Sequence, residues 1–501
     1  MSENHKKYVL ILLLLHLAVA LPLAYFLNIW VDEASSLYTT ERGFFFALQN
    51  ALTDEKQAPL YFWLLSLWRS VNGSILFARL LSIFFSLLAI RFFFALAQKL
   101  FDEKAAFFLT AFFALHPYLF WASLEIRVYS LVVFLSVWWL NLFFENFVRR
   151  EDAEAQKGKD FLFVLLSVVA LYTNYYLGFL FVGGFAALLV LRKWRGSRTY
   201  FLQMIIVGAF ILPLLWVIKA QFAVNTKAFQ EEKEIIIALK IFWNHFMTFV
   251  LPTEIYPSDE VTQISAVRNW FIRAVILMVA FFAIRKRREI LNEKTLVFGV
   301  ISAVIFAFLL AAYLLLGEVY IGIRHLAVVF VPVILAVSLV VIPLLPRKSL
   351  IFLSVFYLSL FGYSLYALYP KLAKRGDWAR VGEFIAQNER PNQPIIVFTT
   401  FDALALPYHY KGQNKIFPDE KFFDWEAEAA AGSAQRWAKQ TEFIISEIPP
   451  EANEIWLLTN EKCEIKDACL PLENFVERNY TIVEERDFYQ EKVRLLRKKV
   501  Q

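Results

Sequence analysis

Residues 295–316 have the sequence TLVFGVISAVIFAFLLAAYLLL, which contains no charged side chain. A helix of roughly 20 apolar residues is long enough to cross the hydrocarbon core of a bilayer. Residues 326–346, LAVVFVPVILAVSLVVIPLLP, have the same character. These two stretches predict a membrane protein with several spans.

The composition of the whole chain supports this interpretation. Hydrophobic residues make up 59% of the 501 residues, charged residues make up 19%, and 52 residues are phenylalanine. A soluble protein has roughly 45–50% apolar residues, so a string of ordinary soluble domains is excluded. The formal net charge of +6 comes from short basic clusters between apolar runs, and we therefore predict no nucleic-acid partner.

Eleven apolar stretches are candidate spans, and basic clusters fall at every second span end. The stretches cover residues 7–28, 75–98, 105–124, 128–148, 161–176, 177–191, 200–220, 270–284, 295–316, 326–346 and 349–369. The clusters are Lys6-Lys7, Lys99 with Lys104, Arg149-Arg150 with Lys157 and Lys159, Arg192-Lys193 with Arg195 and Arg198, Arg285 to Arg288, and Arg347-Lys348. The positive-inside rule places all six clusters in the cytoplasm. We expect an inner-membrane protein with a cytoplasmic N-terminus.

The pattern predicts two domains. Residues 1–369 form a transmembrane catalytic domain with outer juxtamembrane loops at 29–74 and 221–269, and 370–501 form a soluble extracytoplasmic α/β domain. The tail is net acidic, whereas the preceding part is net basic. Short apolar runs predict strands at 394–398, 454–458 and 493–496, and helical spacing occurs at 378–387 and 425–445.

Ionisable side chains near the predicted outer surface are few, and each is a candidate for function. Asp32 and Glu33 follow the first span directly. Adjacent carboxylates cannot share one helix face, so if Asp32 faces a cavity, Glu33 faces elsewhere and braces the following helix. The alternative is that Asp32 merely caps a juxtamembrane helix.

A second group lies in the short outward turn Ser123-Leu-Glu-Ile-Arg-Val-Tyr129. In an extended turn, Glu125, Arg127 and Tyr129 would project to one side. An acid, a guanidinium and a phenol together suit a sugar phosphate. The alternative is an Arg–Glu pair that only pins the turn.

Further polar groups occur at the same predicted level. Arg324 and His325 open a span, and an arginine there requires a carboxylate or a bound phosphate, unless it snorkels to lipid headgroups. The other candidates, in a hairpin tip and in the first outer loop, are Tyr172, Asn174, Tyr175 and Tyr61.

Considered together, these elements resemble the GT-C superfamily of polyprenyl-phosphate-sugar-dependent glycosyltransferases. They are most similar to the branch of protein O-mannosyltransferases and lipid A aminoarabinose transferases. The resemblance rests on the Asp32-Glu33 pair, the Pro59-Leu-Tyr61 segment, Arg79 in the next span, the Glu125-x-Arg127-x-Tyr129 turn, the aromatic hairpin at Tyr172, Arg324-His325, and Asp377-Trp-Ala-Arg380 before the tail.

The resemblance implies roles for individual residues. Asp32 matches the catalytic acid of the first outer loop, Glu125 and Arg127 match a second part of the site, and Arg324 matches the residue that holds the lipid phosphate. Gln57-Ala58 and Asn174 depart from the pattern, because relatives often have His-Pro or Lys-Pro and a histidine there. No metal or phosphate contact is therefore carried over to those positions.

The expected function is transfer of a hexosyl or pentosyl group from a polyprenyl-phosphate-linked donor to a hydroxyl of a protein, lipid or polysaccharide. Asp32, Glu33 and Glu125 are the candidate catalytic carboxylates, and Asp32 is preferred over Glu33 as the general base of an inverting displacement. Arg324 and Arg127 would hold the leaving phosphate. A lipid-linked glycan ligase, or a flippase or transporter of the same intermediates, remains the alternative.

Cofactors and cysteines complete the expectations. No residues with the spacing of a metal site occur, so we treat the enzyme as metal-independent, with a divalent cation near Asp32 and Glu125 left open. The only two cysteines, Cys463 and Cys469, are expected to form a disulfide if the tail lies in an oxidising compartment.

Overall fold

The computed structural model describes most of the chain. The described ranges are residues 3–53, 55, 57–149, 156–228, 235–252, 263–316, 323–344, 347–398, 402–418, 433–460, 463 and 469–499. The chain divides into two compact units. The membrane unit comprises Met1–Ala24, Arg42–Gln221 and Glu231–Leu368, and the C-terminal unit comprises Tyr25–Glu41, Phe222–Gln230 and Tyr369–Gln501.

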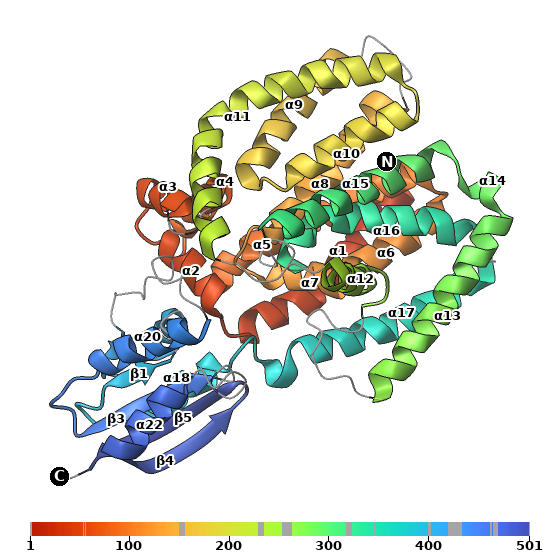
Figure 1. The fold of residues 1–501 in the computed structure, drawn as a ribbon. Coiled ribbons are helices and arrows are strands. Elements are labelled where there is room, and N and C mark those ends of the chain that lie inside the picture. Colours follow the sequence, from red (N-terminus) through yellow and green to blue (C-terminus); the bar gives the residue numbers. More distant parts are fainter. Residues whose placement is uncertain are drawn as a thin grey trace. The chain divides into compact units, whose positions relative to one another are not determined.

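The membrane unit is helical in the part that the structure describes (Figure 1). Its elements are α1 (Glu3–Phe26), α3 (Phe44–Thr53), α4 (Leu60–Arg69), α5 (Ile75–Leu100), α6 (Glu103–Leu115), α7 (Pro117–Leu124), α8 (Tyr129–Phe143), η1 (Phe144–Val148), α9 (Gln156–Thr173), α10 (Leu177–Val190), α11 (Trp194–Ala228), α12 (Ile235–Val250), α13 (Gln263–Arg285), α14 (Arg287–Ile290), α15 (Glu293–Leu316), η3 (Ile323–Leu326), α16 (Ala327–Val341), η4 (Ile342–Leu344) and α17 (Arg347–Leu368). The last residues of α1 and α11 belong to the C-terminal unit.

Among the described residues, six helices are long and apolar enough to cross a membrane. They are His5–Phe26, Ile75–Leu100, Tyr129–Val148, Trp194–Lys219, Glu293–Leu315 and Arg324–Leu344, and the α6–α7 pair, bent by 48°, makes a seventh if it counts as one span. Large apolar side chains on these helices are exposed, as lipid-facing positions are: Trp216 is 81% exposed and Phe210 is 58% exposed. The chain is therefore a multi-pass membrane protein.

The predicted count of eleven spans is not confirmed. All eleven stretches fall mainly on helices, but α9 is not among the helices that are apolar enough to cross a membrane, and the apolar parts of α10, α13 and α17 are short. The predicted outer loop 221–269 also differs, because it contains the apolar helix α12. The predicted outer loop 29–74 contains three short helices in its described residues.

Two glycines explain how the short helix α10 packs in the interior. A Cβ atom on Gly183 would lie 3.1 Å from the Ile301 backbone of α15, and one on Gly184 would lie 2.8 Å from the Trp139 ring of α8. Larger residues would push these helices apart, because protein interiors are close-packed. The Gly-Gly pair therefore lets α10 lie between α8 and α15.

Ion pairs gather several basic clusters at one end of the membrane unit. Lys99 and Lys159 both pair with Glu145, the latter at 3.2 Å, and Lys193 pairs with Glu293. These lysines come from three different predicted cytoplasmic clusters. Their convergence agrees with the placement of those clusters on one side; that this side is cytoplasmic stays a prediction.

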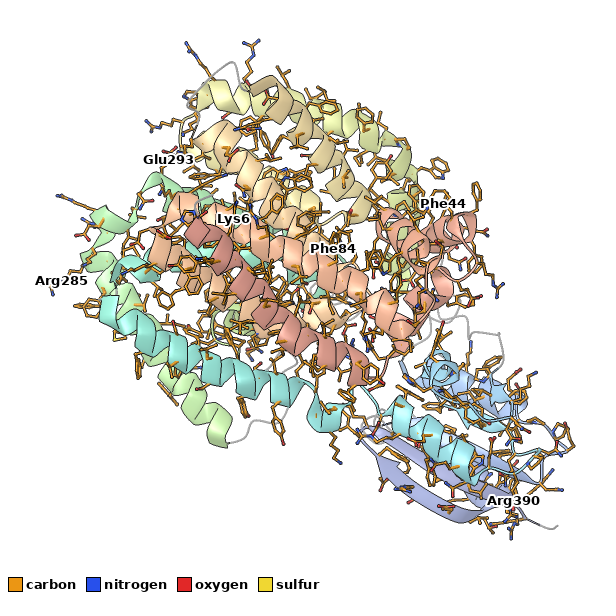
Figure 2. The ribbon with its side chains drawn as sticks, turned by 180° about the vertical axis from the view of Figure 1, so that it is seen from behind. Lys6, Phe44, Phe84, Arg285, Glu293 and Arg390 are labelled. Carbon is orange, nitrogen blue, oxygen red and sulfur yellow. A yellow bond between two sulfur atoms is a disulfide. The ribbon has the colours of Figure 1, made fainter. Side chains whose placement is uncertain are left out.

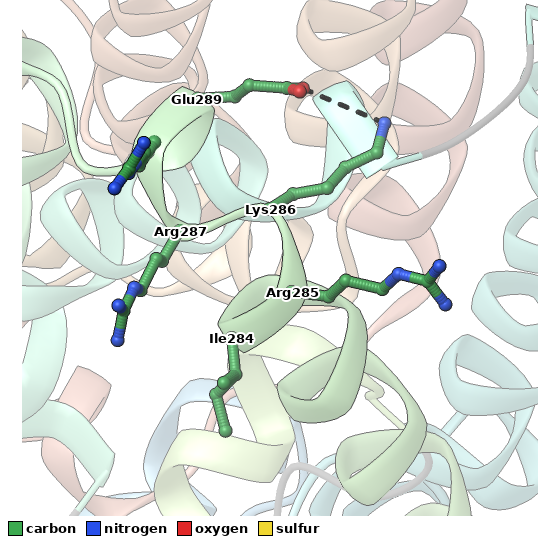
Figure 3. Close-up of a pocket in the computed structure, with 6 residues that line it drawn as sticks. Ile284, Arg285, Lys286, Arg287 and Glu289 are labelled. Carbon is green, nitrogen blue, oxygen red and sulfur yellow. Dashed lines mark ion pairs between the residues drawn. The ribbon is translucent and has the colours of Figure 1, made fainter.

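In Figure 2, Lys6, Arg285 and Glu293 lie at one end of the membrane unit and Phe44 lies at the other. A shallow cavity of about 470 Å³ lies where α13 meets α14 and is lined by the basic run that starts at Arg285 (Figure 3). Within it, Lys286 pairs with Glu289 at 3.7 Å, and both side chains are exposed. We interpret this run as a topology signal rather than a substrate site.

The C-terminal unit is built around a five-stranded sheet (Figure 1). Its elements are α2 (Val31–Thr39), η5 (Pro370–Leu372), α18 (Trp378–Asn388), β1 (Ile395–Val397), η6 (Asp402–Leu404), η7 (Leu406–Tyr408), β2 (Ile416–Phe417), α20 (Ser433–Ser446), β3 (Glu454–Asn460), α22 (Leu470–Asn479), β4 (Tyr480–Phe488) and β5 (Glu491–Lys498). The strand order is β2-β1-β3-β5-β4; β1 is parallel to β2 and β3, and β5 is antiparallel to β3 and β4.

Alternation along the strands buries both faces of this sheet. Leu457 of β3 belongs to a core that includes Ile444 of α20 and Leu472 of α22. The next residue towards the N-terminus, Trp456, faces the opposite side and packs against Phe384 of α18 at 5.9 Å. The small C-terminal sheet is thus covered by helices on both sides.

Most predicted elements of the tail are present. The strands predicted at 394–398, 454–458 and 493–496 correspond to β1, β3 and β5, and the helix at 378–387 corresponds to α18. The second predicted helix is described only from residue 433, as α20. Cys463 and Cys469 form a disulfide, with their Cα atoms 4.7 Å apart.

Candidate active site

Asp32 lies in the first turn of α2, directly after the first span. Trp30 is the N-cap residue and makes no capping hydrogen bond from its side chain, so Asp32 is the second residue of the helix rather than its cap. The backbone carbonyl of Asp32 accepts a hydrogen bond from the Ser36 hydroxyl at 3.2 Å.

Glu33, the second carboxylate, has a different environment. Its Oε2 lies 2.9 Å from Nζ of Lys374, and the two side chains are 0% and 3% exposed. Lys374 belongs to the same C-terminal unit and follows the last predicted span. The charge of Glu33 is thus engaged by a lysine, and the catalytic role expected for Glu33 stays a prediction.

The turn between α7 and α8 carries the second group of candidates. Glu125 is 1% exposed, and Arg127 and Tyr129 are each 6% exposed. The Ser82 hydroxyl of α5 donates to the backbone carbonyl of Glu125 at 2.6 Å. Tyr129 is the first residue of α8 and stacks on Trp121 at 4.8 Å, so it does not project with the other two from an extended turn.

Arg127 has a partner that the sequence did not indicate. Its Nη1 donates to Oε2 of Glu55 at 2.8 Å, with side-chain exposures of 8% and 5%. Gln57 also donates to Oε2 of Glu55 at 3.4 Å. The pairing of an arginine with a glutamate is as expected for a pinned turn, but the glutamate comes from the first outer loop rather than from Glu125.

Arg324 and His325 form the turn η3 before α16. The His325 ring stacks on Tyr176 at 5.2 Å, and its ionisable neighbours are Arg324 and His245 of α12. Tyr176 therefore makes the aromatic contact here, one residue after the predicted Tyr175. His245 was missed because α12 was expected to be a loop.

The remaining candidates make structural contacts. The Tyr172 hydroxyl donates to the Phe210 carbonyl at 3.0 Å, and Asn174 Oδ1 accepts from the Tyr176 amide at 2.9 Å, which closes the α9–α10 turn. Tyr61 is 1% exposed and meets Phe62 edge-on. Residues 317–322, just before Arg324, and Lys56, just before Gln57, lie outside the described residues.

Asp32 and Glu33 belong to the C-terminal unit, whereas Glu125, Arg127 and Arg324 belong to the membrane unit. That these residues act together in one site, as the expected reaction requires, stays a prediction. Within the described ranges, no three His, Cys, Asp or Glu side chains are grouped so that they could hold a metal ion.

Comparison with known proteins gives matches only among solved structures. No known protein family matches the chain, and no curated protein sequence matches it. ArnT from Cupriavidus metallidurans bound to undecaprenyl phosphate is 14% identical, with a TM-score of 0.49 and 98% of both chains covered. The apo state of the same protein is 15% identical, with a TM-score of 0.47, covering 96% of this chain and 97% of that one.

The oligosaccharyltransferase of Archaeoglobus fulgidus in the apo form is 13% identical, with a TM-score of 0.46, covering 93% of this chain and 70% of that one. ArnT and this oligosaccharyltransferase are members of the GT-C superfamily, which the sequence motifs resemble. Because every one of these TM-scores is below 0.5, the activity of this chain has to be argued from its own residues.

Proposed function

We propose that this protein is a membrane glycosyltransferase. It transfers a hexosyl or pentosyl group from a polyprenyl-phosphate-linked donor to an acceptor hydroxyl of a protein, lipid or polysaccharide at the extracytoplasmic face. The observation that carries the proposal is the pair Asp32-Glu33 at the end of the first span, in which Glu33 is engaged by Lys374. We assign Asp32, in the first turn of α2, as the base of the reaction.

The proposed reaction is a single displacement. Asp32 accepts the proton of the acceptor hydroxyl, and the acceptor oxygen bonds to the anomeric carbon. The bond between that carbon and the phosphate oxygen breaks, and the polyprenyl phosphate leaves with the electron pair. Attack opposite to the leaving group inverts the anomeric configuration.

The leaving phosphate requires positive charge and hydrogen-bond donors. We assign this role first to Arg324, which His325 and His245 accompany in the membrane unit. Arg127 is a weaker candidate than the sequence suggested, because Glu55 already neutralises its charge. Glu125 is nearly inaccessible, and we propose that its role is to support the turn rather than to exchange protons.

No step of this reaction needs a metal ion, because a phosphate is a good leaving group once arginine has neutralised its charge. We therefore propose that transfer is metal-independent. Activity that survives treatment with excess EDTA supports this part of the proposal, and loss of activity that Mg²⁺ or Mn²⁺ restores contradicts it.

Reconstitution in liposomes tests the function. The purified protein is given polyprenyl-phosphate-linked hexoses and pentoses, each radiolabelled in the sugar, together with a cell-envelope extract as the source of acceptor. A transferase releases free polyprenyl phosphate as label moves to the acceptor, whereas a flippase moves the intact donor across the bilayer and releases none. Release no greater than in protein-free liposomes with every donor contradicts the proposal.

A further inference from the structure

The segment that carries Asp32 is part of the C-terminal unit, although it directly follows the first span. Residues 25–41 cluster with residues 369–501 and not with the helices of the membrane unit. Contacts that attach this segment come from residues 374–376, a short stretch after the last predicted span, and from His409. The proposed base is therefore held by the unit that contains the sheet.

Asn28 makes the first of these attachments. Its side-chain Oδ1 accepts from the Lys374 amide at 2.8 Å, and its Nδ2 donates to the carbonyls of Lys374 and Gly376 at 3.0 and 2.9 Å. Asn28 is 3% exposed, so these bonds are made in a dry environment, where they are costly to lose.

Lys374 makes the second attachment through its side chain, in the buried pair with Glu33. Two further contacts hold the residues between Asn28 and Asp32. The Ile29 amide donates to Nε2 of His409 at 3.1 Å, and the Arg375 guanidinium lies 4.0 Å from the centre of the Trp30 ring. Contacts therefore hold the side chain of Trp30, which precedes Asp32 in the sequence, and that of Glu33, which follows it.

The backbone that supplies these contacts has an unfavourable conformation. Lys371, Leu372 and Arg375 have φ values of 55°, 56° and 46°, in the left-handed region that residues with a Cβ atom rarely adopt. Such residues persist where surrounding contacts determine them, and they concentrate at functional positions. Asn28 and Glu33 hold this stretch at Lys374, and the Arg380 guanidinium donates to the Lys371 carbonyl.

We propose that Lys374 is a positioning residue for Asp32. Successive helical residues are turned by about 100°, so the ion pair with Glu33 fixes the rotation of the first turn of α2 and with it the direction of the Asp32 carboxylate. A displacement of about 1 Å at a reacting group can cost roughly 10²-fold in rate. This inference rests on the proposed function, since it requires Asp32 to be the base.

Lys374→Met leaves Glu33 buried without its lysine, so this variant alone does not separate lost stability from lost positioning. The double variant Glu33→Gln with Lys374→Met removes both charges and leaves no unpaired one. We expect its apparent Tm to return close to that of the wild type. Its kcat should remain lower by about tenfold or more, with the KM for a radiolabelled polyprenyl-phosphate-linked donor changed less than about threefold.

Arg380→Met is the matched control, because Arg380 pairs with Asp377 at 2.7 Å in the same stretch and is half-exposed. Its kcat should be close to that of the wild type. A double variant with the stability and the kcat of the wild type would show that the pair is only structural and would overturn the inference. If the wild-type protein itself transfers no sugar, the proposed function fails. If the wild type and the double variant are both fully active, the function stands and the positioning role fails.

Discussion

Replacing Glu55 by glutamine should destabilise the membrane unit substantially. The change leaves the Arg127 guanidinium buried without its carboxylate, and an arginine cannot lose its charge at any ordinary pH. The pair has an N–O distance of 2.8 Å and side-chain exposures of only 8% and 5%. Glutamine keeps the size of the side chain and one acceptor oxygen, so the change removes charge rather than volume.

The size of the effect follows from this geometry. Two unit charges centred about 4 Å apart attract by about 4 kcal/mol at an effective dielectric constant of about 20. Removing one partner of a buried pair typically costs about 3–5 kcal/mol, and the retained acceptor places Glu55→Gln near the lower limit. A loss of about 3 kcal/mol corresponds to roughly a hundredfold shift in the unfolding equilibrium.

The assay is unfolding of the purified protein in mixed micelles with increasing denaturant, with Glu289→Gln as the control. Glu289 pairs with Lys286 at 3.7 Å in the same unit, but the two side chains are 68% and 44% exposed. Its loss should cost no more than about 1 kcal/mol, as for other surface pairs. If Glu55→Gln costs no more than Glu289→Gln, Arg127 does not depend on Glu55.

Three further outcomes are expected. Hydrogen bonds from Arg497 and from a glutamine hold the pKa of Glu454 below its usual value. The ionised carboxylate therefore stabilises the sheet above about pH 4, and this contribution is lost as the pH falls through the lowered pKa. Glu454→Gln should speed hydrogen exchange of the β3 amides at pH 7, and the difference from the wild type should shrink below pH 4. Cys463 and Cys469 should resist alkylation under denaturing conditions until a reductant is added. Cys463→Ser should lower the free energy of unfolding of the C-terminal unit by about 2 kcal/mol, given a closed loop of this length. An unchanged unfolding midpoint would speak against the disulfide. A reporter fused at Gln501 should be active only outside the cytoplasm, and cytoplasmic activity would exclude the proposed topology.

The sequence was sufficient to predict the elements that have strong local patterns. Each predicted span falls mainly on a helix, and the buried strands β1, β3 and β5 are the apolar runs of the tail. The strand β4 was missed because it forms an edge of the sheet and is largely exposed, so it has no alternation of apolar residues. The count of eleven spans is not confirmed, because α10 has only 14 residues and the apolar parts of α13 and α17 are short.

The candidate site could be predicted only in part, and for a physical reason. The residue types at Asp32, Arg127 and Arg324 indicate chemistry because such side chains are costly at a membrane boundary. Their partners could not be predicted, because Lys374 lies more than three hundred positions from Glu33, and Glu55 lies on a different loop from Arg127. Without those partners, the sequence could not distinguish a catalytic carboxylate from one that holds a lysine.

The role of Asp32 can be decided by one comparison of rates. Release of polyprenyl phosphate from a lipid-linked sugar donor is measured for the wild type, for Asp32→Asn, and for Glu41→Gln, which changes an exposed carboxylate at the end of the same segment. Asp32→Asn should lower kcat by about 10²-fold or more while the donor still binds, because the base is lost and the size is kept. Glu41→Gln should leave kcat unchanged. Near-normal turnover by Asp32→Asn would contradict the assignment of Asp32 as the base.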